Sequence, residues 1–117
     1  MLYIIIVKGS DNSEAGNLPS LELREAMSAF NKELVEAGVR VMAKGLYPSS
    51  IGMRISYKKP DASPEITEGP FIPSDEVFAG FILIEVQSHE EAVKWALKMP
   101  DPQGFGQGQV ELRRVHE

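Results

Sequence analysis

Tyr47 and Glu68 carry the side chains of this sequence that are best suited to proton transfer. A carboxylate in an apolar interior can act as a general base, and a nearby phenol can donate a proton. The alternative is structural: Glu68 accepts backbone amides of the turn at residues 69–71, and Tyr47 packs in an interface. Both readings stay open, and we take Glu68 and Tyr47 as the candidate catalytic residues.

Arg54 and Phe71 are the candidate ligand-binding residues. Arg54 lies on the polar positions of an alternating segment, so its guanidinium can hold a substrate carboxylate through two parallel hydrogen bonds. It can equally form an ion pair across a hairpin with a carboxylate such as Glu65. Phe71 would supply an apolar wall beside it.

The residues that commonly bind metals are sparse, and we expect neither a metal nor a cofactor. The chain has no cysteine and only two histidines, which excludes thiolate zinc sites and iron–sulfur clusters. His89 falls in the first turn of a predicted helix and His116 near the C-terminus, too far apart in sequence to suggest one site. The glycine-rich segment 104–108 follows a helix and opens a strand, the reverse of a phosphate-binding loop.

Composition and charge argue against nucleic acid and membrane partners. The chain has 12 basic and 17 acidic residues, a formal net charge of −5, which repels phosphate backbones unless positive charges gather on one face. The apolar run at residues 2–7 is too short to cross a bilayer. We therefore expect one domain over residues 1–117 in a cytoplasmic protein.

The apolar patterns predict the order strand, helix, four strands, helix, strand. The short strand at residues 64–67, the fourth in the chain, has the weakest pattern. Leu23, Met27, Phe30 and Leu34 recur at helical spacing between Ser20 and Gly38, which are start and stop signals. Strands are expected at 2–7, 39–47, 51–57, 64–67, 78–86 and 109–115, helices from Ser20 to Gly38 and from Ser88 to Pro100, and a loop up to Asn17.

This order favours an α+β fold, a ferredoxin-like antiparallel sheet with two helices on one face. The strands at 2–7 and 78–86 are apolar on both faces, but two helices can cover only one of them. A second copy of the chain is the expected cover, and a four-stranded sheet face is large enough for a stable interface. The sequence thus predicts a homodimer.

Several short motifs occur in order along nearly the whole chain. These are Gly45-Leu46-Tyr47-Pro48-Ser49-Ser50, Glu68-Gly69-Pro70-Phe71, Phe78-Ala79-Gly80-Phe81, Ser88-His89-Glu90-Glu91-Ala92 and Val110-Glu111-Leu112-Arg113. The sequence resembles the DGPF family of the YCII-related superfamily. The resemblance implies a dimeric α/β barrel, two ferredoxin-like sheets packed face to face. Enzymes suspected in that superfamily use a His and Asp pair, and this chain has Tyr47 and Glu68 at the matching positions.

Two classes of function follow. The first is a cofactor-independent enzyme or small-molecule binder with a pocket near the subunit interface, lined by Tyr47, Arg54, Glu68 and Phe71. The alternative is a non-catalytic dimeric accessory or regulatory module, since the resemblance also implies an association with sigma factors. A pocket with converging polar groups favours the first, and a filled interior with an exposed apolar patch favours the second.

Overall fold

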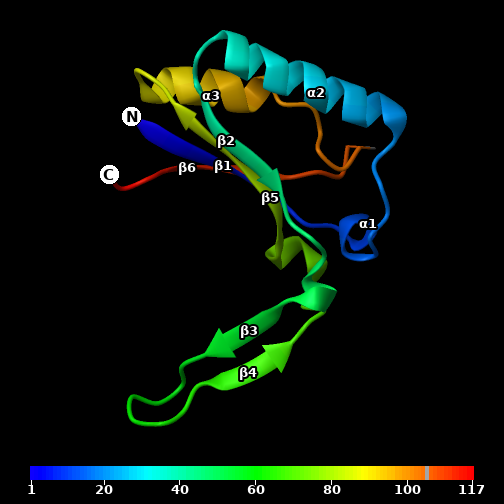
Figure 1. The fold of residues 1–117 in the computed structure, drawn as a ribbon, viewed down its shortest axis with the longest axis vertical. Coiled ribbons are helices and arrows are strands. Elements are labelled where there is room, and N and C mark those ends of the chain that lie inside the picture. The colour runs from blue at the N-terminus through cyan, green and yellow to red at the C-terminus, as the bar shows by residue number, and fades with distance from the viewer. Residues whose placement is uncertain (105) are drawn as a thin grey trace.

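The chain folds into an antiparallel sheet with two long helices along one side and a hairpin that projects from its lower end (Figure 1). This computed structural model describes residues 1–104 and 106–117, apart from the side chain of Asp75; Phe105 lies outside the described residues. The elements are β1 (Leu2–Lys8), α1 (Asp11–Glu14), α2 (Leu21–Glu36), β2 (Arg40–Gly45), β3 (Met53–Ser56), β4 (Glu65–Glu68), β5 (Phe78–Glu85), α3 (His89–Lys98) and β6 (Val110–Arg114), with single 3-10 turns at Ser49–Ile51 and Ser74–Glu76.

The main sheet has the strand order β2-β5-β1-β6. The predicted α+β class and the ferredoxin-like sheet with helices on one face are confirmed. The two doubly apolar strands are central: β1 pairs with β5 through Ile5 and Ile82, and with β6 through Ile5 and Leu112. Helices α2 and α3 cover the face that carries Tyr3, Ile5, Ile82 and Ile84, and the core lies between them.

The other side of the sheet, which we call the outer face, has no helix over it in the described part of the chain (Figure 1). It carries Ile4 and Ile6 from β1 and Phe81 and Leu83 from β5, because these residues alternate with the core positions. Ile4, Phe81 and Leu83 are only half-buried. A single chain closes no barrel.

Both long helices begin and end at the predicted signals. The Ser20 hydroxyl accepts the N–H of Leu23 at 3.1 Å, and Gly38 follows the last turn of α2 with a φ of +73°. In α3 the Ser88 hydroxyl accepts the N–H of Glu91. The Glu91 carboxylate reaches back to the N–H of Gln87, one residue earlier than the predicted capping box requires.

One prediction about the connections was wrong, and another was confirmed. The segment expected to be a loop up to Asn17 contains α1, one helical turn that the Ser10 and Ser13 side chains cap reciprocally. The strands β3 and β4 form the predicted hairpin, but they pair only with each other and do not extend the main sheet. We call this hairpin, residues 53–68, the arm.

Candidate functional site

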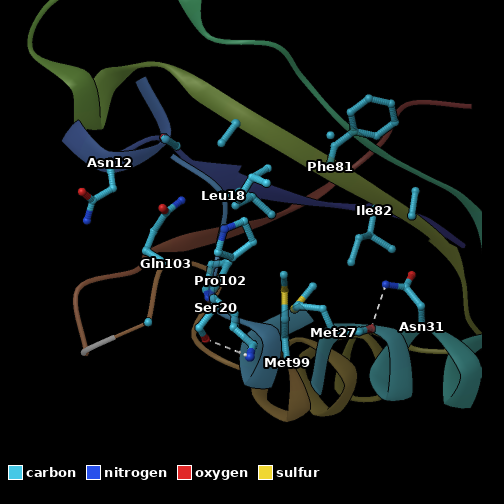
Figure 2. A pocket seen from close by; sticks show the side chains of 18 of the residues that line it. Asn12, Leu18, Ser20, Met27, Asn31, Phe81, Ile82, Met99, Pro102 and Gln103 are labelled. Atoms are coloured by element: carbon cyan, nitrogen blue, oxygen red, sulfur yellow. Dashed lines mark hydrogen bonds between the residues drawn. The ribbon is translucent and has the colours of Figure 1, made fainter. Parts of the chain in front are cut away.

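A cleft of about 1080 Å³ lies between α2, the helix-facing side of the sheet and the loop after α3. Figure 2 shows its apolar floor, where Met27 and Met99 lie beneath Ile82. Phe81 points to the opposite side of β5 in the same view, toward the outer face. The loop residues Leu18 and Pro102 line the other end of the cleft. We call this hollow the helix–sheet cleft.

The helix α2 supplies one wall of the cleft through a single line of residues. Leu23, Met27 and Asn31 are four positions apart, so they stack on one face of the helix. The neighbouring line through Phe30 and Leu34 turns into the core instead. An asparagine thus continues an apolar line of the helix, a sequence pattern that could have indicated a polar group in the wall of a hollow.

Asn31 is the polar group in this wall whose hydrogen bonding is incomplete. Its Nδ2 donates to the carbonyl of Met27 at 3.0 Å, as Figure 2 shows. Its Oδ1 is buried and has no partner among the residues that the structure describes. A buried acceptor without a donor costs about 1–3 kcal/mol, so the wall of the cleft contains an unsatisfied hydrogen-bonding group.

Charged side chains lie among the lining residues of the helix–sheet cleft. Arg40 begins β2 opposite Ile84, a core residue, so it lies on the helix-facing side of the sheet. Glu22 on α2 provides a negative charge. Neither residue forms an ion pair within residues 1–104 and 106–117. The cleft therefore offers both signs of charge to a bound molecule.

A second hollow of about 440 Å³ brings together three of the four predicted site residues. Tyr47, Arg54 and Phe71 all line it, and the Arg54 guanidinium lies 4.4 Å from the centre of the Phe71 ring. That distance suits a cation–π contact. Tyr47 is 83% exposed, and Glu68 is an exposed residue of β4 outside the lining. We call this the Tyr47 hollow.

The turn after β4 is held by residues other than Glu68. The Ser49 hydroxyl accepts the N–H of Phe71 at 2.8 Å, and the carbonyl of Gly52 accepts the N–H of Gly69. Ser49 in turn donates its hydroxyl and its N–H to the carboxylate of Glu14 on α1. The expected role of Glu68 as acceptor of these turn amides is therefore wrong, because Ser49 and Gly52 have taken it.

The close contact between the turn and Ser49 requires glycine at position 69. A Cβ at residue 69 would overlap the backbone carbonyl of Ser49, so only glycine allows the two segments to meet. Ser49, Glu14 and the turn at 69–71 form one connected cluster, which we call the Ser49 knot. Sequence analysis missed it because Glu14 and Ser49 lie 35 positions apart.

The alternative proposed for Arg54 was also wrong. Glu65 pairs with Lys58, whose Nζ lies 2.7 Å from Glu65 Oε2, and not with Arg54. In the hairpin register Arg54 lies opposite Thr67 and Glu65 lies opposite Ser56. Arg54 is consequently free to stack on Phe71.

The remaining candidates are placed apart from both hollows. The Nδ1 of His89 lies 3.1 Å from the buried Tyr3 hydroxyl and shares a hydrogen bond with it. His116 is exposed beyond β6. No group of three His, Asp or Glu side chains in the described part of the chain could hold a metal ion. None of the described helices is both long and apolar enough to cross a membrane.

The glycine-rich loop is organised by an aspartate. Asp101 accepts the N–H groups of Gln103 at 3.0 Å and Gln107 at 3.1 Å. Burial would raise the pKa of the Asp101 carboxyl, but the N–H groups of Gln103, Gly104, Gly106 and Gly108 together lower the pKa below its ordinary value. The loop thus folds around an internal carboxylate.

Comparison with known protein families gives a match over the whole chain. A family model described as the YCII-related domain matches residues 1–117, the whole chain. A search of the curated proteins found no match.

Proposed function

The chain belongs to the YCII-related family, and we propose that it is a homodimeric protein that binds a small organic molecule in the helix–sheet cleft. The observation that carries the proposal is a hollow with an apolar floor whose wall includes a polar side chain, Asn31, with one unpaired acceptor oxygen among the described residues. Ligand sites usually have this character: mostly apolar walls with a few placed polar groups.

The lining indicates the chemistry of the ligand. An apolar body would contact Met27, Ile82 and Met99, and a hydroxyl or amine group would donate to Asn31 Oδ1. The thioethers of Met27 and Met99 can adapt to irregular shapes. The volume of about 1080 Å³ exceeds what a single-ring compound needs, so a molecule of drug-like size can enter.

The homodimer is proposed on the outer face of the sheet. Ile4, Phe81 and Leu83 are apolar residues of central strands that the helices leave uncovered. A second sheet packed on this face would remove them from water, as the dimeric α/β barrel requires. The cleft opens on the opposite side, so a dimer of this kind leaves it accessible.

The ligand proposal is tested by native mass spectrometry of the purified protein and by titration with anilinonaphthalene sulfonate, a dye that fluoresces in apolar sites. Met27→Trp fills the floor of the cleft and should weaken dye binding at least about 10-fold. Val35→Trp is the matched control, because it adds the same ring at an exposed position of α2. Equal binding by the two variants would contradict the proposal.

Asn31 gives a second, sharper comparison. Asn31→Leu keeps the branched shape but removes the acceptor, whereas Asn31→Asp keeps an acceptor oxygen. For a ligand identified by mass spectrometry that carries a donor, Asn31→Leu should bind less well and Asn31→Asp should retain more of the affinity. If both variants bound like the wild type, Asn31 would have no part in the site.

Catalysis by Tyr47 and Glu68 is the second candidate, with Arg54 and Phe71 as ligand-binding residues. The stacked Arg54 and Phe71 in the Tyr47 hollow favour it, since a guanidinium beside an aromatic ring can hold a planar anion. Tyr47→Phe and Glu68→Gln should then abolish turnover of the co-purifying molecule without changing its binding. A non-catalytic accessory module predicts binding without turnover in every variant.

A further inference from the structure

The arm has two chemically different faces. In its register Ile55 lies opposite Ile66 and Met53 opposite Glu68, so Met53, Ile55 and Ile66 share one side, with the Glu68 carboxylate at the base of that side. The other side is polar throughout and carries Arg54, Ser56, Glu65 and Thr67. The arm is therefore an amphipathic ribbon, although it is drawn out from the body of the chain (Figure 1).

The apolar face of the arm is open to water in the single chain. Met53 is 58%, Ile55 46% and Ile66 63% exposed. Ile51 and Phe78, near the base of the arm, are also exposed. A hairpin of two strands is at best marginally stable in water unless its apolar face packs against something.

The exposed area of the whole chain also indicates a surface that a partner could cover. The chain exposes 8222 Å², whereas a compact monomer of 117 residues would expose about 6,300 Å². Its radius of gyration is 16.0 Å, against about 13 Å for a compact chain. The excess of about 1,900 Å² per chain is more than the roughly 800 Å² per partner of a standard interface, so the chain has enough exposed surface for a stable interface.

We propose that the arm is a clasp: the face formed by Met53, Ile55 and Ile66 packs on a second copy of this chain. A hairpin that needs its cover in order to fold requires a partner that is always present at a matching concentration, and a second copy meets this condition. The inference rests on the homodimer proposed above and adds a contact that the outer face alone would not make.

The clasp would leave the Tyr47 hollow on the other side of the arm. Arg54 lines that hollow and shares the polar face of the arm with Ser56 and Thr67. Covering the apolar face therefore leaves Arg54 and Phe71 accessible to a small molecule.

The test compares two lysines at neighbouring positions of β4. Ile66→Lys places a charge on the apolar face of the arm, and Thr67→Lys places the same charge on the polar face. Sedimentation equilibrium should show that Ile66→Lys weakens self-association at least about 10-fold, as loss of a central interface residue does, with Thr67→Lys like the wild type. Circular dichroism will show that both variants keep the fold, because neither residue belongs to the core.

Each outcome has one meaning. A dimeric wild type with a dissociated Ile66→Lys variant supports the clasp. If both variants remain as dimeric as the wild type, the clasp is overturned and the dimer of the outer face stands. A wild type that is monomeric at micromolar concentration overturns the homodimer and the clasp together, while the dye titration still decides the helix–sheet cleft.

Discussion

Ser49 has more hydrogen bonds than any residue that the sequence singled out for chemistry. Its hydroxyl links the Glu14 carboxylate of α1 to the N–H of Phe71, two segments far apart in the chain. The motif residues of the turn, from Glu68 to Phe71, drew attention by their order, but a motif does not reveal which distant side chain satisfies its amides. Only the fold brings Glu14 to Ser49.

The first prediction concerns the Ser49 knot. Ser49→Ala leaves the half-buried N–H of Phe71 without its acceptor and the Glu14 carboxylate without one donor, so the free energy of unfolding should fall by about 1–3 kcal/mol. Ser50→Ala, at the exposed neighbouring position, should change it by less than about 0.5 kcal/mol. Urea melts at one fixed protein concentration measure both. Equal stability of the two variants would mean that the knot contributes nothing.

The second prediction concerns Asp101 and pH. The pKa of its carboxyl is lower in the folded protein than the ordinary value of 3.8. A lowered folded pKa stabilises the native state above the unfolded pKa, and this contribution is lost as the pH falls through the folded pKa. Asp101→Asn should therefore be less stable than the wild type at neutral pH, and the difference should shrink below about pH 4. A difference that stays constant down to pH 3, measured by urea melts, would contradict this.

At the scale of elements, the spacing of apolar residues predicted helices and strands, but it did not predict which strands pair. The helical spacing of Leu23 to Leu34 and the flanking Ser20 and Gly38 led to the correct helix, because caps and an amphipathic face are local signals. The alternation at 51–57 correctly predicted a strand with one apolar side. It could not say that this strand stays outside the main sheet, because strand pairing depends on distant residues.

The third prediction belongs to the contact between the two long helices. Trp95 on α3 meets Phe30 on α2 edge to face, with ring centres 6.3 Å apart, and Lys98 lies over its ring. Because the indole is only half-buried, Trp95→Ala should cost about 1.5–3 kcal/mol, less than a fully buried ring. Leu97→Ala, an exposed position of the same helix, should stay within about 0.5 kcal/mol. If the Trp95 variant were equally mild, the two helices would be held by other contacts.

At the scale of the whole molecule, the sequence has more apolar sheet surface than its two predicted helices can cover, and the structure shows where this surface lies. Strands apolar on both faces predicted a cover that two helices could not supply, and the outer face of β1 and β5 is indeed without one in the described chain. The uncovered outer face could thus be predicted from the apolar residues of these two strands. The arm could not, because its exposure follows from the path of the chain and not from its pattern.

The last prediction follows from the proposed homodimer. If the wild-type dimer unfolds to separate unfolded chains, mass action makes its stability depend on protein concentration, whereas the unfolding of a folded monomer does not depend on it. A rise of about 100-fold in concentration should then increase the apparent free energy of unfolding per dimer by about 2.7 kcal/mol and raise the thermal midpoint. The Ile66→Lys variant should lose most of this dependence, and Thr67→Lys should keep it. Thermal melts over that range of concentrations measure the effect, and a wild-type midpoint that does not move would show that the chain folds without a partner despite its uncovered surfaces.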